Sequence, residues 1–369
     1  MSPAFPRGAL CSVWMREAWP DPVRIGLASR ERRGARDMKR AILINQRPGS
    51  VRRVFAERQM ERLHGLVDVR EACVSAEELA CDAAKEAEVA FSTWGMPTLD
   101  EETIRRCLPS LRALFYAAGS VQAFARPFLN CGVRVFSAWQ ANGRSVAQFA
   151  AAQIMLALKG YFRVQPLLER QGRRAAWALL EQYPGAYEVR VGLLGCGAIG
   201  SQVAQILRDT DCEVWVYDPF LPAARAEELG VRLMSMEDIF RECLVISNHL
   251  ANLPATQGII RREHLMSMRP YATFINTGRG AQLNEADLLD ALTVDGTRTA
   301  LLDVLTDEGH SDASPLMRLP NCLITPHIAG ASGREVRRMA DRIMDAFEAW
   351  EAGGRPDCEV TEGMLETMA

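Results

Sequence analysis

The sequence lacks the features that mark several large classes of protein. Its net charge of −3 gives no strongly basic surface for nucleic acid and no charged surface for lipid headgroups. No uninterrupted apolar segment reaches the ~18 residues that a membrane-spanning helix requires. The best candidate, FAAAQIMLAL, is shorter and contains Gln153. We therefore expect neither a nucleic-acid partner nor a membrane partner.

The ten cysteines follow no metal-binding pattern. They form no CxxC pair, and no Cys/His spacing of the kind found at zinc sites occurs. Cys131, Cys196 and Cys322 have apolar neighbours in the sequence, which suits reduced thiols in a reducing compartment. We expect a cytoplasmic protein without a structural metal.

What the sequence does have is the composition of an ordinary globular protein, with 48% hydrophobic and 24% charged residues. A chain of 369 residues is long for one hydrophobic core and favours about two domains. Residues 1–37 are rich in Arg and Pro and show no helical or alternating pattern. We expect them to be a disordered leader, or the product of a start codon placed too early, with folded structure from Met38 onward.

Short apolar runs alternate with amphipathic stretches over residues 38–137. The runs are AILIN, VAFST, LRALFYAAG and VRVFSA, and a helical pattern over 50–64 follows the first of them. This alternation is typical of a parallel sheet covered by helices. A strongly apolar helix is then predicted over 145–162, where it could link two domains.

The alternation restarts at residue 189. Six apolar runs follow: VRVGLL, EVWVYD, CLVISNHL, ATFINT, TALLDVL and CLITP. They predict six strands of a doubly wound sheet. We therefore predict an α/β fold with a Rossmann-type dinucleotide-binding domain over 138–330. The second α/β domain, for the substrate, consists of 38–137 and 331–369, and it includes an amphipathic helix that Gly353 and Gly354 end.

The first of these six runs leads into a glycine fingerprint. Gly195, Gly197 and Gly200 form G-x-G-x-x-G between a predicted strand and a predicted helix. In a dinucleotide site the first glycine permits a tight turn, the second lets the backbone approach the pyrophosphate, and the third allows close helix–strand packing. The helix N-terminus offers its free N–H groups to the phosphates.

An acidic residue stands where the adenosine ribose would bind. Asp218 ends the next predicted strand, about 20 residues after the first glycine. Its carboxylate would accept hydrogen bonds from the ribose diol and repel a 2′-phosphate. The pattern favours NAD over NADP, although Arg225 lies close enough in the sequence to leave NADP open.

Polar residues also follow three of the later predicted strands. They are Arg279, then Asp303 with Glu308 five residues beyond, and finally His327. Because ligands of open α/β sheets bind beyond the carboxyl ends of the strands, we expect these side chains to converge on one crevice. Singly, each has an ordinary alternative: a helix cap for Arg279, a solvated loop acid for Glu308, a structural hydrogen bond for His327. Jointly, behind a dinucleotide fingerprint, they favour a catalytic site.

Several motifs together resemble the D-isomer-specific 2-hydroxyacid dehydrogenase family, namely GCGAIG, YDPF, INTGRG, LLDV and TPHIAG. The resemblance extends over most of the chain from about Met38. It implies a flavodoxin-like substrate domain beside the Rossmann-type domain, NAD as the cofactor and a small 2-oxo or 2-hydroxy acid as the substrate. It also implies a homodimer, with the helical stretch near 145–162 close to its interface.

By this resemblance, Arg279 corresponds to the substrate-binding arginine, and Glu308 with His327 to the acid–base pair. The chemistry agrees, because a planar guanidinium can bind a carboxylate and polarise the neighbouring carbonyl. A protonated His327 would supply the proton when hydride reaches the carbonyl carbon. Glu308, hydrogen-bonded to the other ring nitrogen, would orient the imidazolium and stabilise it.

The resemblance implies further contacts. Asp303 corresponds to the residue that binds the nicotinamide amide, and His249 to a cofactor-side position. The backbone N–H groups of Ser120 and Val121, in AAGSVQ, correspond to those that hold the substrate carboxylate. A plain strand-to-helix turn at 120–121 and a structural histidine at 249 are the alternatives. The remaining predicted cofactor contacts are Ala198, Ile199 and Thr277.

We therefore predict an NAD-dependent oxidoreductase that interconverts a small 2-oxo acid, such as glyoxylate or hydroxypyruvate, and the D-2-hydroxy acid. A formate dehydrogenase fits less well, because that branch carries glutamine where Glu308 stands. From another functional class, a corepressor-like protein that senses dinucleotides could have the same fold and keep the same residues. Turnover distinguishes the two, because a sensor binds NADH with little or no flux.

Overall fold

The computed structural model describes residues 38–73 and 78–366 of the chain. The predicted leader, residues 1–37, lies outside the described residues. The chain divides into two compact units. Of the described residues, the first unit comprises those up to Ala138 together with Val336–Glu362, and the second comprises Trp139–Glu335 together with 363–366.

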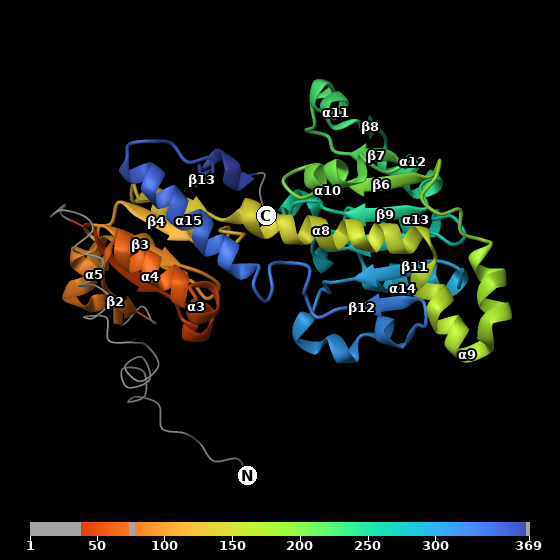
Figure 1. Ribbon diagram of the computed structural model, residues 1–369, viewed down its shortest axis with the longest axis horizontal. Helices are drawn as coiled ribbons and strands as arrows, with labels where there is room; N and C mark the ends of the chain where they lie inside the picture. Colours follow the sequence, from red (N-terminus) through yellow and green to blue (C-terminus); the bar gives the residue numbers. More distant parts are fainter. Residues whose placement is uncertain (1–37, 74–77, 367–369) are drawn as a thin grey trace, which may run out of the picture. The chain divides into compact units, whose positions relative to one another are not determined.

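The first unit is built on a six-stranded sheet in the order β13-β5-β4-β3-β1-β2 (Figure 1). Its strands are β1 (Arg40–Ile44), β2 (Asp68–Cys73), β3 (Val89–Ser92), β4 (Ala113–Tyr116), β5 (Arg134–Ser137) and β13 (Glu359–Val360). All pair in parallel except β13, which runs antiparallel to β5. The parallel strands follow the flavodoxin-like order 2-1-3-4-5.

Helices cover the sheet of the first unit. They are α3 (Pro48–Val54), α4 (Glu57–Leu66), α5 (Asp82–Glu86), α6 (Glu101–Cys107), α7 (Ala125–Asn130) and α15 (Val336–Glu351). The predicted C-terminal helix is α15, which packs against α3, α4 and β4. Its Phe347 ring contacts the rings of Phe91 and Phe115, and such buried aromatic pairs add to the burial of apolar area.

The second unit is built on a seven-stranded, wholly parallel sheet in the order β12-β11-β10-β9-β6-β7-β8. Its strands are β6 (Arg190–Leu194), β7 (Glu213–Tyr217), β8 (Arg232–Leu233), β9 (Val245–Asn248), β10 (Thr273–Asn276), β11 (Thr299–Leu302) and β12 (Cys322–Ile324). In chain order this is the Rossmann arrangement 3-2-1-4-5-6 with one more strand at the edge. The predicted fold class is confirmed.

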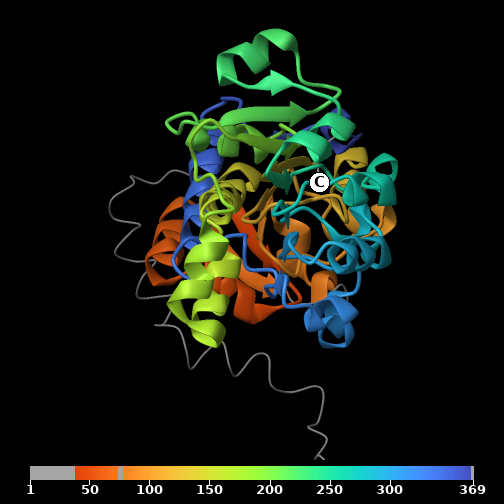
Figure 2. The same cartoon turned by 90° about the vertical axis from the view of Figure 1, so that its right-hand side faces the viewer.

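Helices lie on both faces of this sheet (Figure 2). They are α8 (Trp139–Leu158), α9 (Tyr161–Leu180), α10 (Gly200–Leu207), α11 (Ala223–Leu229), α12 (Met236–Glu242), α13 (Arg262–Met266) and α14 (Glu285–Val294). Alternate strand residues point to opposite faces. In β10, Phe274 joins the core under α12–α14, whereas Ile275 joins the core under α8 and α10.

Three strands were not predicted. β8 and β13 have only two residues each, too few for a hydrophobic pattern. The third, β2, reads DVREAC and lies at the edge of its sheet, where charged residues are tolerated and the apolar run is lost.

Two predicted helices differ in extent. The helix over 50–64 is two helices, because Phe55 between α3 and α4 has non-helical angles and points into the core. The helix over 145–162 begins earlier, at Trp139, and ends at Leu158. Gly160, with φ of 65°, then turns the chain into α9.

Among the described residues, no helix combines the length and the apolar character needed to cross a membrane. Eight cysteines are free: Cys81, Cys107, Cys131, Cys196, Cys212, Cys243, Cys322 and Cys358. The part of the chain that the structure describes contains no cluster of three or more metal-ligating side chains.

Candidate active site at the strand ends of the second unit

The glycine fingerprint forms a tight turn between β6 and α10. Gly195 has φ of 88°, and a Cβ there would lie 2.9 Å from the backbone carbon of His249. A Cβ on Gly200 would lie 2.1 Å from the Gly195 oxygen, so the first turn of α10 packs directly on the loop. A Cβ on Gly197 would meet nothing within 4 Å. The backbone is therefore open to a ligand at Gly197, as a pyrophosphate requires.

Asp218 holds this loop in place. Its Oδ2 accepts a hydrogen bond from the Cys196 N–H (2.8 Å), and its Oδ1 accepts one from the Phe220 N–H (2.9 Å). The carboxylate is half-buried at the end of β7, beside the glycine turn. The predicted cofactor contacts Ala198 and Ile199 lie in the turn that leads into α10, where Ala198 is exposed and Ile199 is half-buried.

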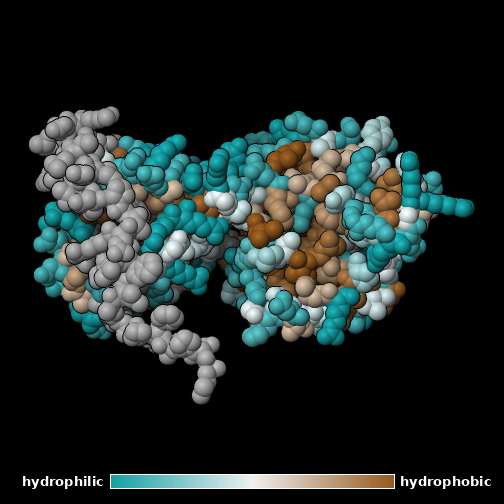
Figure 3. All heavy atoms as spheres, turned by 60° about the horizontal axis from the view of Figure 1, so that its bottom comes forward, coloured by the Kyte–Doolittle hydropathy of each residue, from teal (hydrophilic) through white to brown (hydrophobic). Residues whose placement is uncertain are grey.

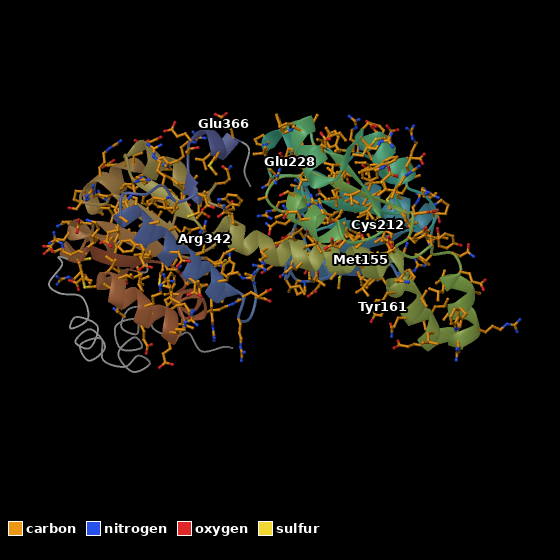
Figure 4. All side chains as sticks on the ribbon, turned by 45° about the horizontal axis from the view of Figure 1, so that its top comes forward. Met155, Tyr161, Cys212, Glu228, Arg342 and Glu366 are labelled. Atoms are coloured by element: carbon orange, nitrogen blue, oxygen red, sulfur yellow. The ribbon has the colours of Figure 1, made fainter. Side chains whose placement is uncertain are left out.

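Arg225, the residue that left NADP open, has a partner of its own. Its Nη1 lies 2.7 Å from Glu228 Oε2, within α11 (Figure 4 labels Glu228). A guanidinium already paired with a carboxylate is a weaker receptor for a 2′-phosphate. The pairing supports the choice of NAD.

His249 and Thr277 follow β9 and β10 and are both buried. His249 donates its backbone N–H to Leu194 O (2.7 Å), but neither ring nitrogen has a hydrogen-bond partner among the described residues. Burial lowers the pKa of His249 to about 4, so the ring is neutral at neutral pH. The Thr277 hydroxyl also lacks a partner in this part of the chain. Buried polar groups of this kind are normally satisfied, and a bound dinucleotide would supply partners.

The two residues predicted to form the acid–base pair, His327 and Glu308, lie side by side. His327 Nδ1 lies 2.9 Å from Glu308 Oε2, and the two side chains are 44% and 46% exposed. His327 Nε2 makes no hydrogen bond to a described residue and is available to a ligand. His327 also has a φ of 55°, which is uncommon for a residue other than glycine and is found where the surroundings impose it.

Asp303 imposes that conformation. The side chain is buried at the end of β11 and accepts three hydrogen bonds from the segment around His327. The donors are the Thr325 hydroxyl (2.6 Å), the Ile328 N–H (2.8 Å) and the Ala329 N–H (2.8 Å). The structure thus gives Asp303 a role that was not predicted, the anchoring of the histidine loop. Its predicted contact with the nicotinamide amide stays a prediction.

Arg279 follows β10, the strand two places from β12 in the sheet. Its Nη1 donates to the neighbouring Gly278 O (2.8 Å), and no described carboxylate pairs with it. The guanidinium is half-buried, so a substrate carboxylate would be an effective partner. The structure brings Arg279, Glu308 and His327 to the same edge of one sheet, as expected for a doubly wound fold.

Ser120 and Val121 lie in the first unit, after β4. Neither backbone N–H donates to a described residue, which fits the prediction that these groups bind a carboxylate. The loop before them is held by the buried Ser137, whose hydroxyl donates to the carbonyls of Ala118 (3.0 Å) and Gly119 (2.6 Å).

Sequence reasoning missed three buried amides behind the site. Asn248, Asn276 and Gln282 hydrogen-bond one another and the two loops that carry His249 and Arg279. Asn248 and Asn276 stand within the predicted strand-end motifs at the same register of neighbouring strands. Two amides at matching strand ends were the signal that could have found them.

Comparison with known proteins shows what the second unit is similar to. Residues 154–329 match the family model described as D-isomer specific 2-hydroxyacid dehydrogenase, NAD binding domain. The D-3-phosphoglycerate dehydrogenase of Mycobacterium bovis is 36% identical over 224 residues, which is 60% of this chain and 41% of that protein. The enzyme of the same name from Archaeoglobus fulgidus is 32% identical over 209 residues, 56% of this chain and 38% of that protein. The chain thus spans about two fifths of the length of these relatives.

Solved structures share the fold. A phosphoglycerate oxidoreductase from Rhizobium etli superposes with a TM-score of 0.74 at 21% identity, covering 89% of this chain and 99% of that one. A D-isomer specific 2-hydroxyacid dehydrogenase from Lactobacillus delbrueckii, solved with NAD, gives a TM-score of 0.70 at 20% identity, covering 87% of this chain and all of that one. The matched domain and the geometry of its glycine turn confirm NAD as the cofactor. Over residues 154–329 the chain is thus similar to the NAD binding domain of the D-isomer specific 2-hydroxyacid dehydrogenase family.

Proposed function

We propose that the protein is an NAD-dependent oxidoreductase that interconverts a small 2-oxo acid and the corresponding D-2-hydroxy acid. The observation that carries the proposal is the 2.9 Å pair of His327 and Glu308 at the same sheet edge as Arg279, which has no carboxylate partner among the described residues. A carboxylate receptor and a proton donor are the two groups that reduction of a 2-oxo acid needs from the protein.

The roles of the residues follow from their hydrogen-bonding capacity. When bound, NADH supplies the hydride that the carbonyl carbon accepts. Arg279 binds the substrate carboxylate and polarises the carbonyl oxygen, on which negative charge develops. His327 donates a proton from Nε2 to that oxygen, while its Nδ1–H is held by Glu308, whose negative charge stabilises the imidazolium. In the oxidation of the hydroxy acid, the same Nε2 accepts the proton.

The cofactor contacts are assigned to the glycine turn with Ala198 and Ile199, and to Asp218, His249, Thr277 and Asp303. Neutral His249 can donate one ring N–H to a phosphate or amide oxygen, which would satisfy its buried ring. The backbone N–H groups of Ser120 and Val121 are proposed as donors to the substrate carboxylate. Residues 38–137 and 331–369 are proposed as the substrate domain, and 138–330 as the dinucleotide domain. The compact units differ from these bounds at the C-terminal side, where the residues up to Glu335 and residues 363–366 belong to the second unit.

Glyoxylate and hydroxypyruvate are the proposed substrates. D-3-phosphoglycerate enters as a third candidate, because relatives that are 36% and 32% identical carry that name. We also propose a cytoplasmic location, in line with the free cysteines. Burial raises the pKa of the Cys322 thiol to about 12, so it stays protonated.

A homodimer is proposed from the surface of the second unit. Apolar side chains gather on one face of it (Figure 3). Four of the large exposed ones lie on α8 and α9: Leu156, Tyr161, Leu168 and Trp177, between 41% and 53% exposed. An exposed apolar surface of this kind on a globular protein typically marks an interface.

The test follows the absorbance of NADH in both directions of the reaction: NADH oxidation with glyoxylate, hydroxypyruvate and other 2-oxo acids, and NAD reduction with D-3-phosphoglycerate, which is already a 2-hydroxy acid. We expect turnover by the wild type and a loss of roughly 10²-fold or more in His327→Ala. The matched control is His310→Ala, because His310 pairs with Asp307 at 2.9 Å in the same loop region but has no proposed role. Tight NADH binding without turnover on any substrate would refute the proposal and favour a dinucleotide sensor.

A further inference from the structure

A network of three side-chain amides lies beneath the strand ends of the second unit. Asn248 ends β9, Asn276 ends β10, and Gln282 belongs to the short 3-10 helix Gly280–Gln282. All three are at most 1% exposed. Asn248 Nδ2 donates to Asn276 Oδ1 (3.0 Å) and to Gln282 Oε1 (2.7 Å), so the three amides form one buried cluster.

One side of the cluster holds the backbone of Arg279. Gln282 Oε1 accepts the Arg279 N–H (3.1 Å), and Asn276 Nδ2 donates to the Arg279 carbonyl (3.2 Å). The Gly278 N–H donates to Asn276 Oδ1 (3.0 Å). A Cβ on Gly278 would lie only 2.6 Å from Gln282 Oε1, so the loop fits over the amides only with glycine there.

The other side holds the segment that follows His249. Gln282 Nε2 donates to the carbonyls of Leu250 (2.9 Å) and Ala251 (3.0 Å). Asn248 Oδ1 accepts the Leu250 N–H (3.2 Å). His249 itself faces the glycine turn, since its backbone lies against Gly195.

Gln282 is the centre of this arrangement because every hydrogen-bonding position it has is in use. Its two N–H groups go to one loop, and its oxygen accepts from the other loop and from Asn248. In a buried site, an amide that loses a partner is left unsatisfied. A displacement of the loop after His249 therefore cannot leave the Arg279 backbone undisturbed without breaking a buried hydrogen bond.

We propose that Asn248, Asn276 and Gln282 are positioning residues that couple the binding of NADH at the His249 loop to the orientation of Arg279 toward its anionic substrate. The inference rests on the proposed function, in which Arg279 binds the substrate carboxylate. It makes the two ligands mutually stabilising: each one orders a loop that the amides share with the other. By linkage, the factor by which NADH tightens substrate binding equals the factor by which substrate tightens NADH binding.

The experiment measures that factor in the full-length protein. The dissociation constant of NADH is measured by its fluorescence with and without oxalate, a dianion of two adjacent carboxylates that resembles a 2-oxo acid in shape but has no keto group to accept hydride. Gln282→Glu keeps the acceptor toward Arg279 and removes the donors to Leu250 and Ala251. Asn276→Asp keeps its acceptor and removes the donor to the Arg279 carbonyl. The two variants cut the network on opposite sides, so a folding defect in one leaves the other decisive.

The matched control is Asn321→Asp. Asn321 is a buried amide of the same unit, and its Nδ2 donates to the carbonyls of Leu292 (3.0 Å) and Arg298 (2.8 Å). It precedes β12, at the opposite end of the strands from the site. The control therefore loses two comparable hydrogen bonds without touching either site loop.

We expect oxalate to tighten NADH binding by the wild type, and we expect each network variant to lower this factor by about fivefold or more. Asn321→Asp should keep the wild-type factor, whatever its thermal stability. The inference would be overturned if both folded network variants kept the wild-type factor by which oxalate tightens NADH binding, or if Asn321→Asp lowered this factor equally. Either result would leave the proposed function intact. A wild type that binds NADH, turns over none of the 2-oxo acids and fails to bind oxalate would overturn the proposed function and this inference with it.

Discussion

Gly197 and Gly200 belong to one motif, but their replacement by alanine should affect different properties. Gly197→Ala should weaken NADH binding, whereas Gly200→Ala should lower the stability of the protein. A Cβ at Gly197 meets nothing within 4 Å, and the φ of this residue lies outside the left-handed range. A Cβ at Gly200 would lie 2.1 Å from the Gly195 oxygen, a backbone atom that cannot rotate away. The missing side chain at Gly197 leaves space for a ligand, and the missing side chain at Gly200 leaves space for the protein's own backbone.

The magnitudes follow from these contacts. Gly200→Ala must displace the glycine turn or the start of α10, and overpacking of this kind costs about 1–3 kcal/mol. For a unit of this size that is a fall in Tm of several degrees, at about 2–4 °C per kcal/mol. Gly197→Ala should change the stability of the free protein by less than about 0.5 kcal/mol. It should nevertheless weaken NADH binding at least tenfold, or about 1.4 kcal/mol, because the methyl group occupies the approach of the pyrophosphate.

Two assays on each variant decide the matter. Thermal unfolding without ligand measures the loss of stability caused by overpacking. A fluorescence titration with NADH measures the affinity of the glycine turn for the cofactor. Wild-type NADH affinity in Gly197→Ala would refute the placement of the pyrophosphate at this turn. A loss of stability in Gly197→Ala equal to that in Gly200→Ala would refute the distinction between the two positions.

Three further outcomes are expected. Because burial lowers the pKa of His249 to about 4, the unfolded chain binds more protons between pH 4 and its ordinary pKa near 6.5. The free energy of unfolding of the apo protein should therefore fall by about 3 kcal/mol as the pH drops through that window. In His249→Gln, urea unfolding should show a smaller dependence of this free energy on pH, and the same dependence as in the wild type would contradict the prediction. Glu285 accepts the Thr306 N–H at 2.6 Å, at the base of the segment that carries Glu308. Glu285→Ala should lower kcat by roughly 3–10-fold at unchanged NADH affinity, the net value of one hydrogen bond, while Glu285→Gln restores it; equal kcat in the two variants would argue against this role. Asp218→Ala should narrow the preference for NADH over NADPH, measured as the ratio of their dissociation constants, and an unchanged ratio would remove Asp218 from the ribose site.

The sheets were predictable wherever a strand is buried on both faces. Val245–Asn248 and Thr273–Asn276 read as apolar runs because each of their residues is buried, and parallel central strands have no polar face. The same rule failed at the edges, where Asp68–Cys73 carries charges and Arg232–Leu233 is exposed. A hydropathy pattern identifies strands that are buried. Edge strands are only partly buried, so their hydropathy pattern is weak.

The site was predictable to a different depth in each of its parts. Gly195, Gly200 and the pair of Glu308 and His327 could be inferred because their chemistry requires a residue type at a stated place in the chain. The left-handed backbone of His327 could not, since it results from three hydrogen bonds to Asp303 that join segments more than 20 residues apart. A motif defined by residue spacing cannot predict hydrogen bonds between segments that are distant in the sequence.

The amide network shows why such supporting residues escape a reading by motifs. Asn248 and Asn276 stand beside residues that the motifs single out, yet an asparagine at a strand end is also an ordinary turn residue. What distinguishes them is their pairing at one register and their joint contact with Gln282, which requires the order of the strands in the sheet. Once β9 and β10 are known to be neighbours, two buried asparagines at matching ends must find partners, because a buried amide without one is costly. The partners they find are the backbones of the two loops that the proposed reaction uses, and this is why the network, more than any single proposed catalytic residue, ties cofactor and substrate to one another.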